Sequence, residues 1–399
     1  GEIGIQKMFP KNFINFPVST YNSLYDTWNI SEVKNNIYFF TYSLGVSMYN
    51  NKDIKRISIP DTLNKLQFYM GNTKYKNEKI LVNIRSYGIS IFDGKTFSKL
   101  NSKFFKEYTP FYTYYDEKKD IVLSGTTVGL IIFDNKDYRI IDKPFGNKNP
   151  NHKVVCIAKD TLGRYWLGGF KKISLLVNDS IINFPTKEFP FDFGGNTMYV
   201  DYKGNIWIGN EKGLFFYNYK TFKKIDIPNF KSIMGFITGV EKNRLLIGNM
   251  NNLGVLFLDN FYLTGNCHIK LYDKYNGFLA SECGQNGAFT DSKGYVWIAG
   301  TDRVVKFDPR IVKINQNPPK TYFKELSYIN PKMKKITLYD NVSDNFKLKY
   351  NQKNIRIDYG AISTTAPQKV KFKYMLEGYD LTWSEANDQQ FVVYTNLPP

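Results

Sequence analysis

The sequence is poor in the residues on which most catalytic and metal sites depend. Its 399 residues include two histidines, His152 and His268, and three cysteines. It contains no H-E-x-x-H, G-x-S-x-G or Walker motif, and the adjacent pair Cys267 and His268 would point to opposite faces of a strand. The sequence therefore predicts a protein that is not an enzyme and that holds no metal and no cofactor.

Paired cysteines and long apolar runs are also missing. None of Cys156, Cys267 and Cys283 lies in a C-x-x-C pair, and an odd number argues against a disulfide framework. Buried free thiols are the favoured interpretation, with a bridge between Cys267 and Cys283 as the alternative. No apolar run approaches the roughly 18 residues of a membrane span, and the N-terminus lacks the pattern of a signal peptide. The chain is therefore expected to be cytosolic or the mature part of an exported protein.

Acidic residues are outnumbered by basic ones, which gives a formal net charge of +18. Such a charge is typical of proteins that bind an acidic polysaccharide, nucleic acid or a membrane surface. The lysines are scattered, however, whereas binding footprints are clustered. A composition rich in Lys, Asn, Ile, Tyr and Phe is therefore the favoured explanation. With 42% hydrophobic and 17% aromatic residues, the chain can bury a large core, which excludes a disordered protein.

One motif, D-x-x-G-x-x-W, recurs along the chain. Its complete copies are Asp160, Gly163 and Trp166; Asp201, Gly204 and Trp207; and Asp291, Gly294 and Trp297. Weaker copies share an apolar strand at the tryptophan position, and the anchors of all copies are Phe39, Leu81, Leu123, Trp166, Trp207, Leu246 and Trp297. A period of about 42 residues with several strands per unit is typical of β-propellers.

The repeats predict a seven-bladed β-propeller over residues 1–316. A four-stranded blade cannot bury both of its apolar faces alone, whereas radial stacking buries each face against a neighbour. The Asp and Gly of each copy are expected to form a turn, and the Trp is expected to be a wedge between blades. Trp28 is expected in the first strand of blade one. The strand that closes the ring is expected at residues 4–9 or 312–315.

The period stops after Asp308 and Pro309, and residues 317–399 are predicted to form a second domain. A Pro-rich segment, residues 316–320, indicates the boundary. Alternating polar and apolar residues predict short antiparallel strands at 321–329, 346–350, 354–361, 370–380 and 390–397. This number of strands in about 80 residues is typical of an immunoglobulin-like β-sandwich.

The blades resemble the two-component-regulator propeller repeats of bacterial sensors, whose pattern is D-x-x-G-x-I-W-I-G-T-x-x-G-L-x-x-Y. Residues 276–309 look like the last blade of such a propeller, and the N-terminal stretch resembles the start of single-propeller members. The tail resembles the triple-tyrosine (Y_Y_Y) domain that follows these propellers. NQKNIRIDYGA, KFKYMLEGYDLTW and VVYTNLPP match that domain, and Tyr374 and Tyr394 match two of its name-giving tyrosines. The third tyrosine is expected after Pro399, so the domain is interpreted as lacking its last strand.

This resemblance implies the periplasmic ligand-sensing domain of an inner-membrane regulator of transcription, of the kind found in Bacteroidetes-like hybrid two-component systems. In such proteins a membrane helix and either a histidine kinase or a helix-turn-helix output follow the triple-tyrosine domain. The implied ligand is an oligosaccharide or another small solute, with an anionic ligand as one option. The resemblance also implies a homodimer through the C-terminal domain, no contact of this part with nucleic acid, and membrane attachment only through a segment outside this chain.

A ligand of a propeller is expected at one mouth of the central channel, where loops of several blades converge. The loops between the second and third strands should gather there with the connections between blades, such as 108–115 and 189–196. The residues of these loops with the cationic, aromatic or amide groups that a sugar or an anion needs are Arg85, Tyr87, Lys171, Asn210, Lys212 and Asn249. For each of them a solvated loop position is the alternative.

Two other functions stay open at this point. A protein-interaction scaffold without a small ligand would show the same repeats. A polysaccharide-cleaving propeller would take its two carboxylates from different blades. Most acidic residues lie in expected turns, which favours binding over cleavage.

Overall fold

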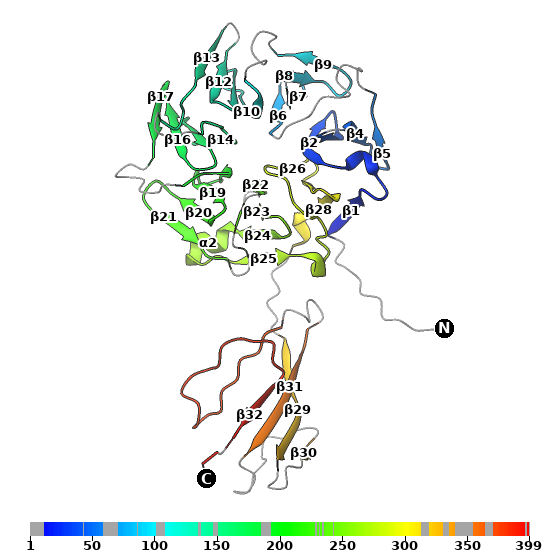
Figure 1. Ribbon diagram of the computed structural model, residues 1–399, viewed down its shortest axis with the longest axis vertical. Helices are drawn as coiled ribbons and strands as arrows, with labels where there is room; N and C mark the ends of the chain where they lie inside the picture. Colours follow the sequence, from blue (N-terminus) through cyan, green and yellow to red (C-terminus); the bar gives the residue numbers. More distant parts are fainter. Residues whose placement is uncertain are drawn as a thin grey trace. The chain divides into compact units, whose positions relative to one another are not determined.

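The computed structural model describes residues 12–42, 44–58, 71–85, 87–100, 108–134, 137–146, 151–184, 193–227, 230, 232–233, 235–241, 243–312, 319–329, 335–339, 354–363, 370–395 and 397–398. The chain divides into two compact units, Gly1–Val312 and Lys313–Pro399. In the described part of the first unit, seven four-stranded antiparallel sheets surround a central axis, as the blades of a propeller do (Figure 1). The predicted all-β class and the seven-bladed propeller are therefore confirmed.

Blades one to six each run as a meander from an inner to an outer strand, and in blade seven the outer strand comes instead from the N-terminal part of the chain. Blades one to three contain β2 Thr27–Val33, β3 Asn36–Thr41, β4 Gly45–Tyr49 and β5 Ile54–Arg56; β6 Thr73–Tyr75, β7 Lys79–Ile84, β8 Gly88–Phe92 and β9 Phe97–Lys99; and β10 Pro110–Asp116, β11 Ile121–Thr126, β12 Leu130–Phe133 and β13 Tyr138–Ile141. Blades four and five contain β14 Cys156–Lys159, β15 Tyr165–Gly168, β16 Ile173–Val177 and β17 Ser180–Asn183; and β18 Thr197–Val200, β19 Ile206–Asn210, β20 Gly213–Tyr217 and β21 Phe222–Ile225. Blades six and seven contain β22 Phe236–Val240, β23 Arg244–Gly248, β24 Leu253–Phe257 and β25 Ile269–Tyr272; and β26 Ala288–Thr290, β27 Val296–Ala299, β28 Arg303–Phe307 and β1 Phe13–Pro17. Trp28 lies in β2, as predicted.

The core of the propeller lies between the blades. Each of the seven interfaces between neighbouring blades holds a cluster of buried apolar side chains. Trp166 packs between blades four and five, Trp207 between five and six, and Trp297 between seven and one, each with an exposed fraction of 0%. The repeated tryptophans therefore lie where radial stacking removes the most apolar surface from water.

One carboxylate connects the turn of each complete motif to its tryptophan. Asp201 accepts hydrogen bonds through Oδ1 from the backbone N–H groups of Lys203 and Asn205 at 2.9 and 3.0 Å, and through Oδ2 from Trp207 Nε1 at 2.7 Å. Gly204 completes the turn with a φ of 83°, which an L side chain rarely adopts. Asp160 and Asp291 bind Trp166 and Trp297 in the same way, at 3.0 and 2.8 Å. The carboxylate thus joins the turn to the tryptophan that packs between the blades.

In blade one, the anchor expected at Phe39 is displaced by one residue. Tyr38 faces the cluster shared with blade two, whereas Phe39 packs against Trp297 in the cluster shared with blade seven. A shift of one residue moves a strand side chain to the opposite face of its sheet. Because blade one lacks the D-x-x-G turn, its sequence offered no marker for this register.

The ring closes through β1, which pairs along its whole length with β28. The register places Phe13 opposite Phe307 and Pro17 opposite Arg303. The expectation that residues 4–9 or 312–315 supply this strand is wrong, because residues 13–17 occupy the outer edge of blade seven; residues 4–9 and 313–315 lie outside the described residues. Phe16 faces Trp297 with ring centres 5.8 Å apart. The closing strand therefore covers an edge and also fills an interface.

Blade six contains an insertion that lengthens its repeat. Helix α2, Leu258–Thr264, lies between β24 and β25, and the short 3-10 helix η2, Lys274–Asn276, follows β25. Phe261 of α2 packs against Trp207 with ring centres 5.2 Å apart. The interval between the anchors Leu246 and Trp297 is longer than the others because it includes this helix. A further 3-10 helix, η1 Asn22–Leu24, precedes blade one.

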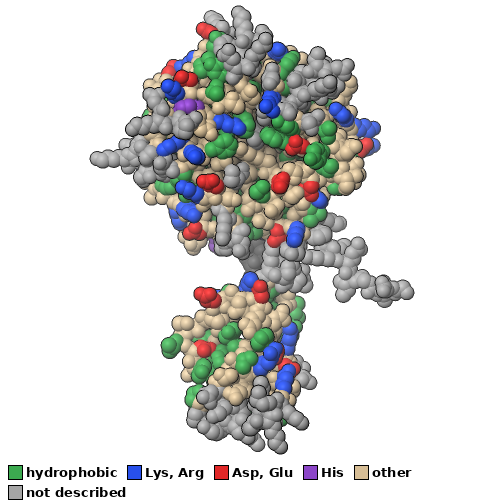
Figure 2. Space-filling model, in the orientation of Figure 1, with side chains coloured by type: hydrophobic (Ala, Val, Ile, Leu, Met, Phe, Trp, Pro, Cys, Tyr) green, Lys and Arg blue, Asp and Glu red, His purple; other side chains and the backbone are tan. Residues whose placement is uncertain are grey.

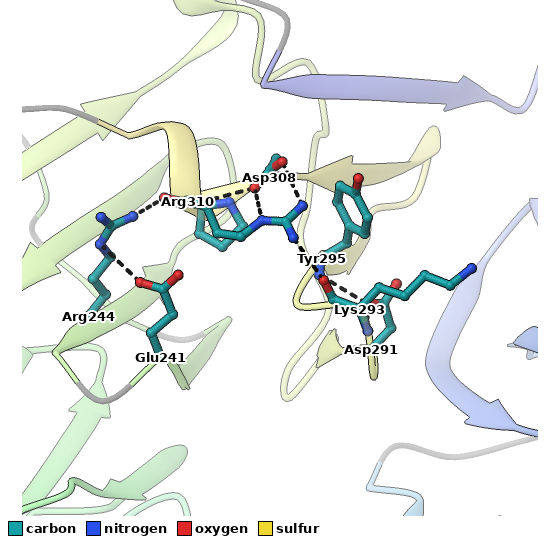
Figure 3. A network of polar contacts seen from close by, with 8 residues as sticks. Glu241, Arg244, Asp291, Lys293, Tyr295, Asp308 and Arg310 are labelled. Atoms are coloured by element: carbon teal, nitrogen blue, oxygen red, sulfur yellow. Dashed lines mark hydrogen bonds and ion pairs between the residues drawn. The ribbon is translucent and has the colours of Figure 1, made fainter. Parts of the chain in front are cut away.

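The last residues of the propeller are tied to blades six and seven by a polar network (Figure 3). Arg310, in the 3-10 helix η3 Pro309–Ile311, donates through Nε to Asp308 Oδ1 at 2.8 Å and through a guanidinium N–H to the Lys293 carbonyl at 3.1 Å. Arg244 of blade six donates to the Pro309 carbonyl. These contacts hold the chain at the point where the first unit ends.

The three cysteines are free in this structure. Cys156 and Cys283 are buried and Cys267 is partly buried. Burial raises the thiol pKa of Cys267 to about 11 and that of Cys283 to about 12, and it raises the pKa of Cys156 as well. Because the thiolate is the reactive form, the thiols are expected to be unreactive at neutral pH.

We expect a colorimetric thiol reagent at pH 8 to label the native protein slowly and to label three thiols in denaturant. Raising the pH towards 11 should speed the labelling of Cys267 first, because its pKa is lower than that of Cys283 and it is less buried. Fewer than three thiols in the denatured, unreduced protein would indicate a disulfide and contradict this expectation.

The second unit contains one four-stranded sheet in its described residues. Its order is β30 Lys335–Tyr339, β29 Lys320–Ile329, β31 Ile355–Ile362 and β32 Phe391–Tyr394. The prediction of a strand at 370–380 is wrong. This segment forms an isolated bridge between Phe372 and Asn387 and then turns at Gly378, whose φ is 82°. The strand expected at 346–350 lies outside the described residues. Tyr374 and Tyr394 both pack in the apolar cluster of this unit.

Candidate functional site

The loops between the second and third strands gather on one face of the propeller, which we call the loop face. They hydrogen-bond to the connections that lead into the inner strands. For example, Ile233 N–H donates to the Asn210 carbonyl at 2.8 Å and Gly195 N–H to the Gly169 carbonyl at 3.0 Å. The residues that the sequence suggested for ligand binding lie in these loops, in blades two, four, five and six, except Asn210, which is the last residue of the strand that leads into one of them. The D-x-x-G turns lie at the other ends of the strands.

Asn210 and Asn249 hold the conformation of their own loops. Asn210 has an exposed fraction of 2%, accepts a hydrogen bond from Lys212 N–H at 2.8 Å and donates one to the Gly194 carbonyl at 2.7 Å. Asn249 accepts hydrogen bonds from the N–H groups of Asn251 and Asn252. Thr41 and Thr126 stabilise the corresponding loops of blades one and three through their hydroxyl groups. A polar residue that recurs at this position is explained by loop structure.

The other suggested residues differ in their surroundings. Lys171 and Lys212 are exposed at the tips of their loops. Tyr87 packs on the cluster between blades one and two, and Lys99 Nζ lies 4.2 Å from the centre of its ring. Arg85 is exposed and donates to the hydroxyl of Tyr42 at 3.0 Å. Of these residues, Arg85 is the one that the structure joins to a larger group of aromatic side chains.

The position that follows the loop-stabilising residue varies from blade to blade. It is occupied by Tyr42 in blade one, Arg85 in blade two and Phe170 in blade four. Residues that differ between repeats are free of the packing constraint that makes the other positions alike. These loop tips are therefore where a propeller can specify a ligand.

An aromatic and cationic group, the mouth cluster, connects these tips to the inner strands; its residues are Trp28, Tyr42, Arg85, Phe111, Lys153 and Phe170. The rings of Trp28 and Tyr42 are stacked with centres 4.8 Å apart. Trp28 also packs with Phe111, which is buried in β10. Lys153 Nζ lies 3.5 Å from the centre of the Phe111 ring and 5.2 Å from that of Phe170. The cluster thus runs from blade one to blade four.

A segment of blade seven crosses the same mouth; we call residues 281–287 the bridging segment. Gln285 Nε2 donates to the Asn196 carbonyl at 2.7 Å, and Asn286 donates through Nδ2 to the Val155 carbonyl at 3.1 Å. Asn286 N–H also donates to the Gly235 carbonyl at 2.7 Å. These acceptors belong to the inner connections of blades five, four and six, so the bridging segment covers their side of the channel.

A small cavity of about 90 Å³ separates the bridging segment from Trp28 and is lined by Asp26, Thr27, Trp28, Glu282, Gly284, Gln285 and Thr301. Two amide side chains that immediately precede inner strands have unused hydrogen-bonding capacity. Within the described residues, both side-chain atoms of Asn72 and the Nδ2 of Asn196 are buried without a hydrogen-bond partner. Buried polar groups normally bind protein, water or a ligand. The mouth therefore offers amide as well as aromatic and cationic groups.

Two larger hollows lie away from the mouth cluster. One, of about 380 Å³, lies among turns of the opposite face and is lined by lysines and glutamates. Several of its charges are already paired, since Glu32 accepts hydrogen bonds from Ser292, and Lys76 Nζ lies 2.5 Å from Asp120 Oδ1. The other, of about 410 Å³, is an apolar hollow of the second unit that includes Tyr359, Tyr374 and Trp383.

Sequence reasoning missed Trp28, Tyr42, Phe111 and Lys153 as site residues. Phe111 belongs to the segment 108–115, which was expected to be a connection; residues 110–116 are instead the inner strand β10. One signal was available for Trp28, which is the only tryptophan of residues 1–312 outside the D-x-x-G-x-x-W motif. No sequence pattern set Lys153 apart, because what distinguishes it from other lysines is its partial burial in the folded protein.

The face shown in Figure 2 carries Lys and Arg side chains spread over the propeller rather than gathered in one patch. The described residues include no group of three or more His, Cys, Asp or Glu side chains that could hold a metal ion. Among these residues there is also no helix that is both long and apolar enough to span a membrane.

Comparisons with known proteins agree with this architecture. The Y_Y_Y domain family matches residues 363–399. A protein of Formosa agariphila named histidine kinase P4 is 23% identical over 419 residues, which cover 95% of this chain and 30% of that protein. The chain thus spans less than a third of the length of this relative.

Solved structures with the same fold come from extracellular domains of B. thetaiotaomicron. The domain of the hybrid two component system BT3049 superposes with a TM-score of 0.75 at 17% identity, over 98% of this chain and 54% of that one. The domain of BT4673 gives a TM-score of 0.55 at 16% identity, over 96% of this chain and 55% of that one. This chain spans about half of each. The resemblance that the blade and tyrosine motifs indicated is therefore confirmed: the chain has the fold of extracellular domains of hybrid two-component systems and carries a Y_Y_Y domain at its C-terminal end.

Proposed function

We propose that this chain is the extracytoplasmic sensor domain of a membrane-bound signal-transduction regulator. It binds an oligosaccharide or a similar small solute at the mouth cluster and signals through the C-terminal unit. The observation that carries this proposal is the mouth cluster itself, where aromatic rings and two cationic side chains converge on non-repeating positions of the loop face. The likeness to extracellular domains of two-component systems supports the sensor role and a periplasmic location.

A sensor role explains the site better than catalysis does. Hydrolysis of a glycosidic bond requires two carboxyl groups about 5–10 Å apart that flank the bond. In the mouth cluster the nearby Asp26 accepts the indole N–H of Trp28 at 2.7 Å, so its Oδ1 already has a structural partner. The groups that converge at the mouth cluster are therefore suited to binding rather than to cleavage. The regulator to which this chain belongs is proposed to act through a kinase or a DNA-binding output beyond this chain.

The proposal is tested by calorimetric titration of the chain with a panel of neutral and acidic oligosaccharides. The Trp28→Ala variant is expected to bind the ligand at least about tenfold more weakly, which corresponds to about 1.4 kcal/mol. The reason is that Trp28 supports the rings of both Tyr42 and Phe111. Trp28→Phe should bind with intermediate affinity, because it retains a ring but loses the hydrogen bond to Asp26.

The matched control is Trp383→Ala, since Trp383 lies in the second unit with an exposed fraction of 60%. It should leave binding unchanged. A ligand that binds wild type and Trp28→Ala equally well would show that the mouth cluster is not its site. A folded protein that binds no member of the panel, but recovers one protein partner from cell-surface extract, would favour an interaction scaffold instead.

A further inference from the structure

Lys153 is an unusual lysine for a loop residue. Its side chain is partly buried, its Nζ lies 3.5 Å from the centre of the Phe111 ring, and the Phe170 ring lies 5.2 Å away. Within the described residues, no carboxylate forms an ion pair with it. Most lysine ammonium groups extend into water. An ammonium group that lies over aromatic rings loses part of its hydration, and its attraction to the ring faces compensates for this loss only in part.

Burial also lowers the pKa of Lys153, and no acidic side chain raises it again. A nearby carboxylate would shift the pKa in the opposite direction. Two acidic residues of the mouth, Asp26 and Glu282, line the cavity beside Trp28, and Asp26 accepts the indole N–H of Trp28. Lys153 is therefore a cation whose charge the described part of the protein leaves unbalanced.

Phe170 provides an apolar surface next to this cation. Its exposed fraction is 37%, and it stands at a loop tip that varies between blades. Apolar ring faces next to a charged group suit a sugar ring that carries an anionic substituent, since one face packs on the aromatic ring while the substituent meets the cation. Arg85, at the other end of the mouth cluster, adds a second positive charge.

We propose that the mouth cluster binds an acidic oligosaccharide, with a carboxylate or sulfate group on Lys153 and the sugar ring against Phe170. This inference rests on the proposed function and specifies its ligand class. Arg85, which belongs to the same cluster through Tyr42, would contact a further anionic group of a longer ligand. The overall charge of +18 is not needed for this selectivity, because the contact is made by individual side chains.

A first experiment uses inorganic sulfate as the probe. At constant ionic strength, replacing chloride with sulfate should raise the melting temperature of wild type and should change the fluorescence of Trp28, which is the partly exposed tryptophan of the propeller. Lys153→Met should lose the fluorescence change and show a smaller rise in melting temperature; the rise that remains is the general stabilisation of folded proteins by sulfate. Lys171→Met is the matched control, because Lys171 is an exposed lysine of the same face, and it should respond as wild type does.

A second experiment uses pairs of oligosaccharides that differ only in charge: galacturonic acid oligomers with their methyl esters, and sulfated galactose oligomers with their desulfated forms. For the pair that binds, the charged member is expected to bind wild type at least about tenfold more tightly. The preference should vanish in Lys153→Met, and both members should bind Phe170→Ala more weakly.

The outcomes separate the two proposals. Charged and neutral members that bind wild type equally well would overturn the acidic-ligand inference and leave the sensor proposal standing. Sulfate effects that are identical in wild type and Lys153→Met would also overturn it. If no oligosaccharide binds, the sensor proposal itself fails. If Lys153→Met does not fold, the ratio between the affinities of wild type for the charged and the neutral oligosaccharide still tests the inference. Lys153→Arg should retain the preference for the charged member.

Discussion

Replacing Trp207 with alanine is expected to lower the free energy of unfolding of the propeller by about 3–5 kcal/mol, the range found when large aromatic side chains are removed from cores. Trp207 is completely buried between blades five and six. Its ring contacts Phe216 and Phe261 at 4.9 and 5.2 Å. The cavity would therefore open in an interface that also anchors helix α2.

The same substitution removes a hydrogen-bond donor from Asp201. The Oδ2 of Asp201 accepts the indole N–H of Trp207 at 2.7 Å and also the hydroxyl of Tyr262. Trp207→Phe keeps most of the apolar volume and loses the N–H, so its expected cost is smaller, about 1–2 kcal/mol. The difference between the two variants measures how much of the effect is packing and how much is the carboxylate contact.

Urea denaturation followed by circular dichroism measures both values. Trp383→Ala serves as the control, because Trp383 is 60% exposed and belongs to the second unit; it should change the propeller transition by less than about 0.5 kcal/mol. A loss of less than about 1 kcal/mol in Trp207→Ala would show that Trp207 is not an essential wedge between blades.

Replacing Phe16 with serine should have the second-largest effect, a loss of about 3 kcal/mol or more. Phe16 lies in β1, the strand that closes the ring, and its exposed fraction is 8%. It stacks on Trp297 with ring centres 5.8 Å apart and contacts Tyr49 of blade one at 5.6 Å. A serine here would leave both rings partly uncovered and weaken the attachment of β1 to the edge of blade seven.

Ile14→Ser provides a matched control in the same strand. Ile14 is 50% exposed, so its loss should cost less than about 0.5 kcal/mol. Because an uncovered strand edge is a template for association, Phe16→Ser is also expected to aggregate at lower temperature than Ile14→Ser does. Light scattering during a thermal ramp measures this, and equal aggregation temperatures would contradict the role of β1 as the closing strand.

Much of the propeller could be predicted because the residues of the repeat are those that its turns require for their backbone conformation and hydrogen bonds. Gly204 adopts a φ of 83°, and Asp201 provides the acceptors for its turn, so the motif marks the same corner in every complete copy. Blade one lacks this corner, and there the expected anchor Phe39 is one residue from the side chain, Tyr38, that faces blade two. The closing strand was misplaced because strand pairing at distant ends of a chain leaves no local pattern.

The candidate site was predicted less completely. Loop composition pointed to the loops of this face, and Arg85 in one of them joins the mouth cluster. Asn210, however, uses both ends of its amide to hold its own loop and the Gly194 carbonyl. An amide that stabilises a turn and an amide that binds a ligand look identical in a sequence, since both are polar residues between strands.

The sequence by itself determined the all-β class and the blade count, because these follow from local turn geometry and from a hydrophobic period repeated along the chain. The likeness to extracellular domains of two-component systems came instead from the resemblance of the blade and tyrosine motifs to those of known proteins. Only the tertiary structure decided which side chains meet at the mouth. Lys153, Phe111 and Trp28 come from three different blades, and the unbalanced charge of Lys153 exists only because the folded blades bury it among rings. A repeat fixes where blades stack, whereas burial and pairing of a charge depend on neighbours that are distant in the chain.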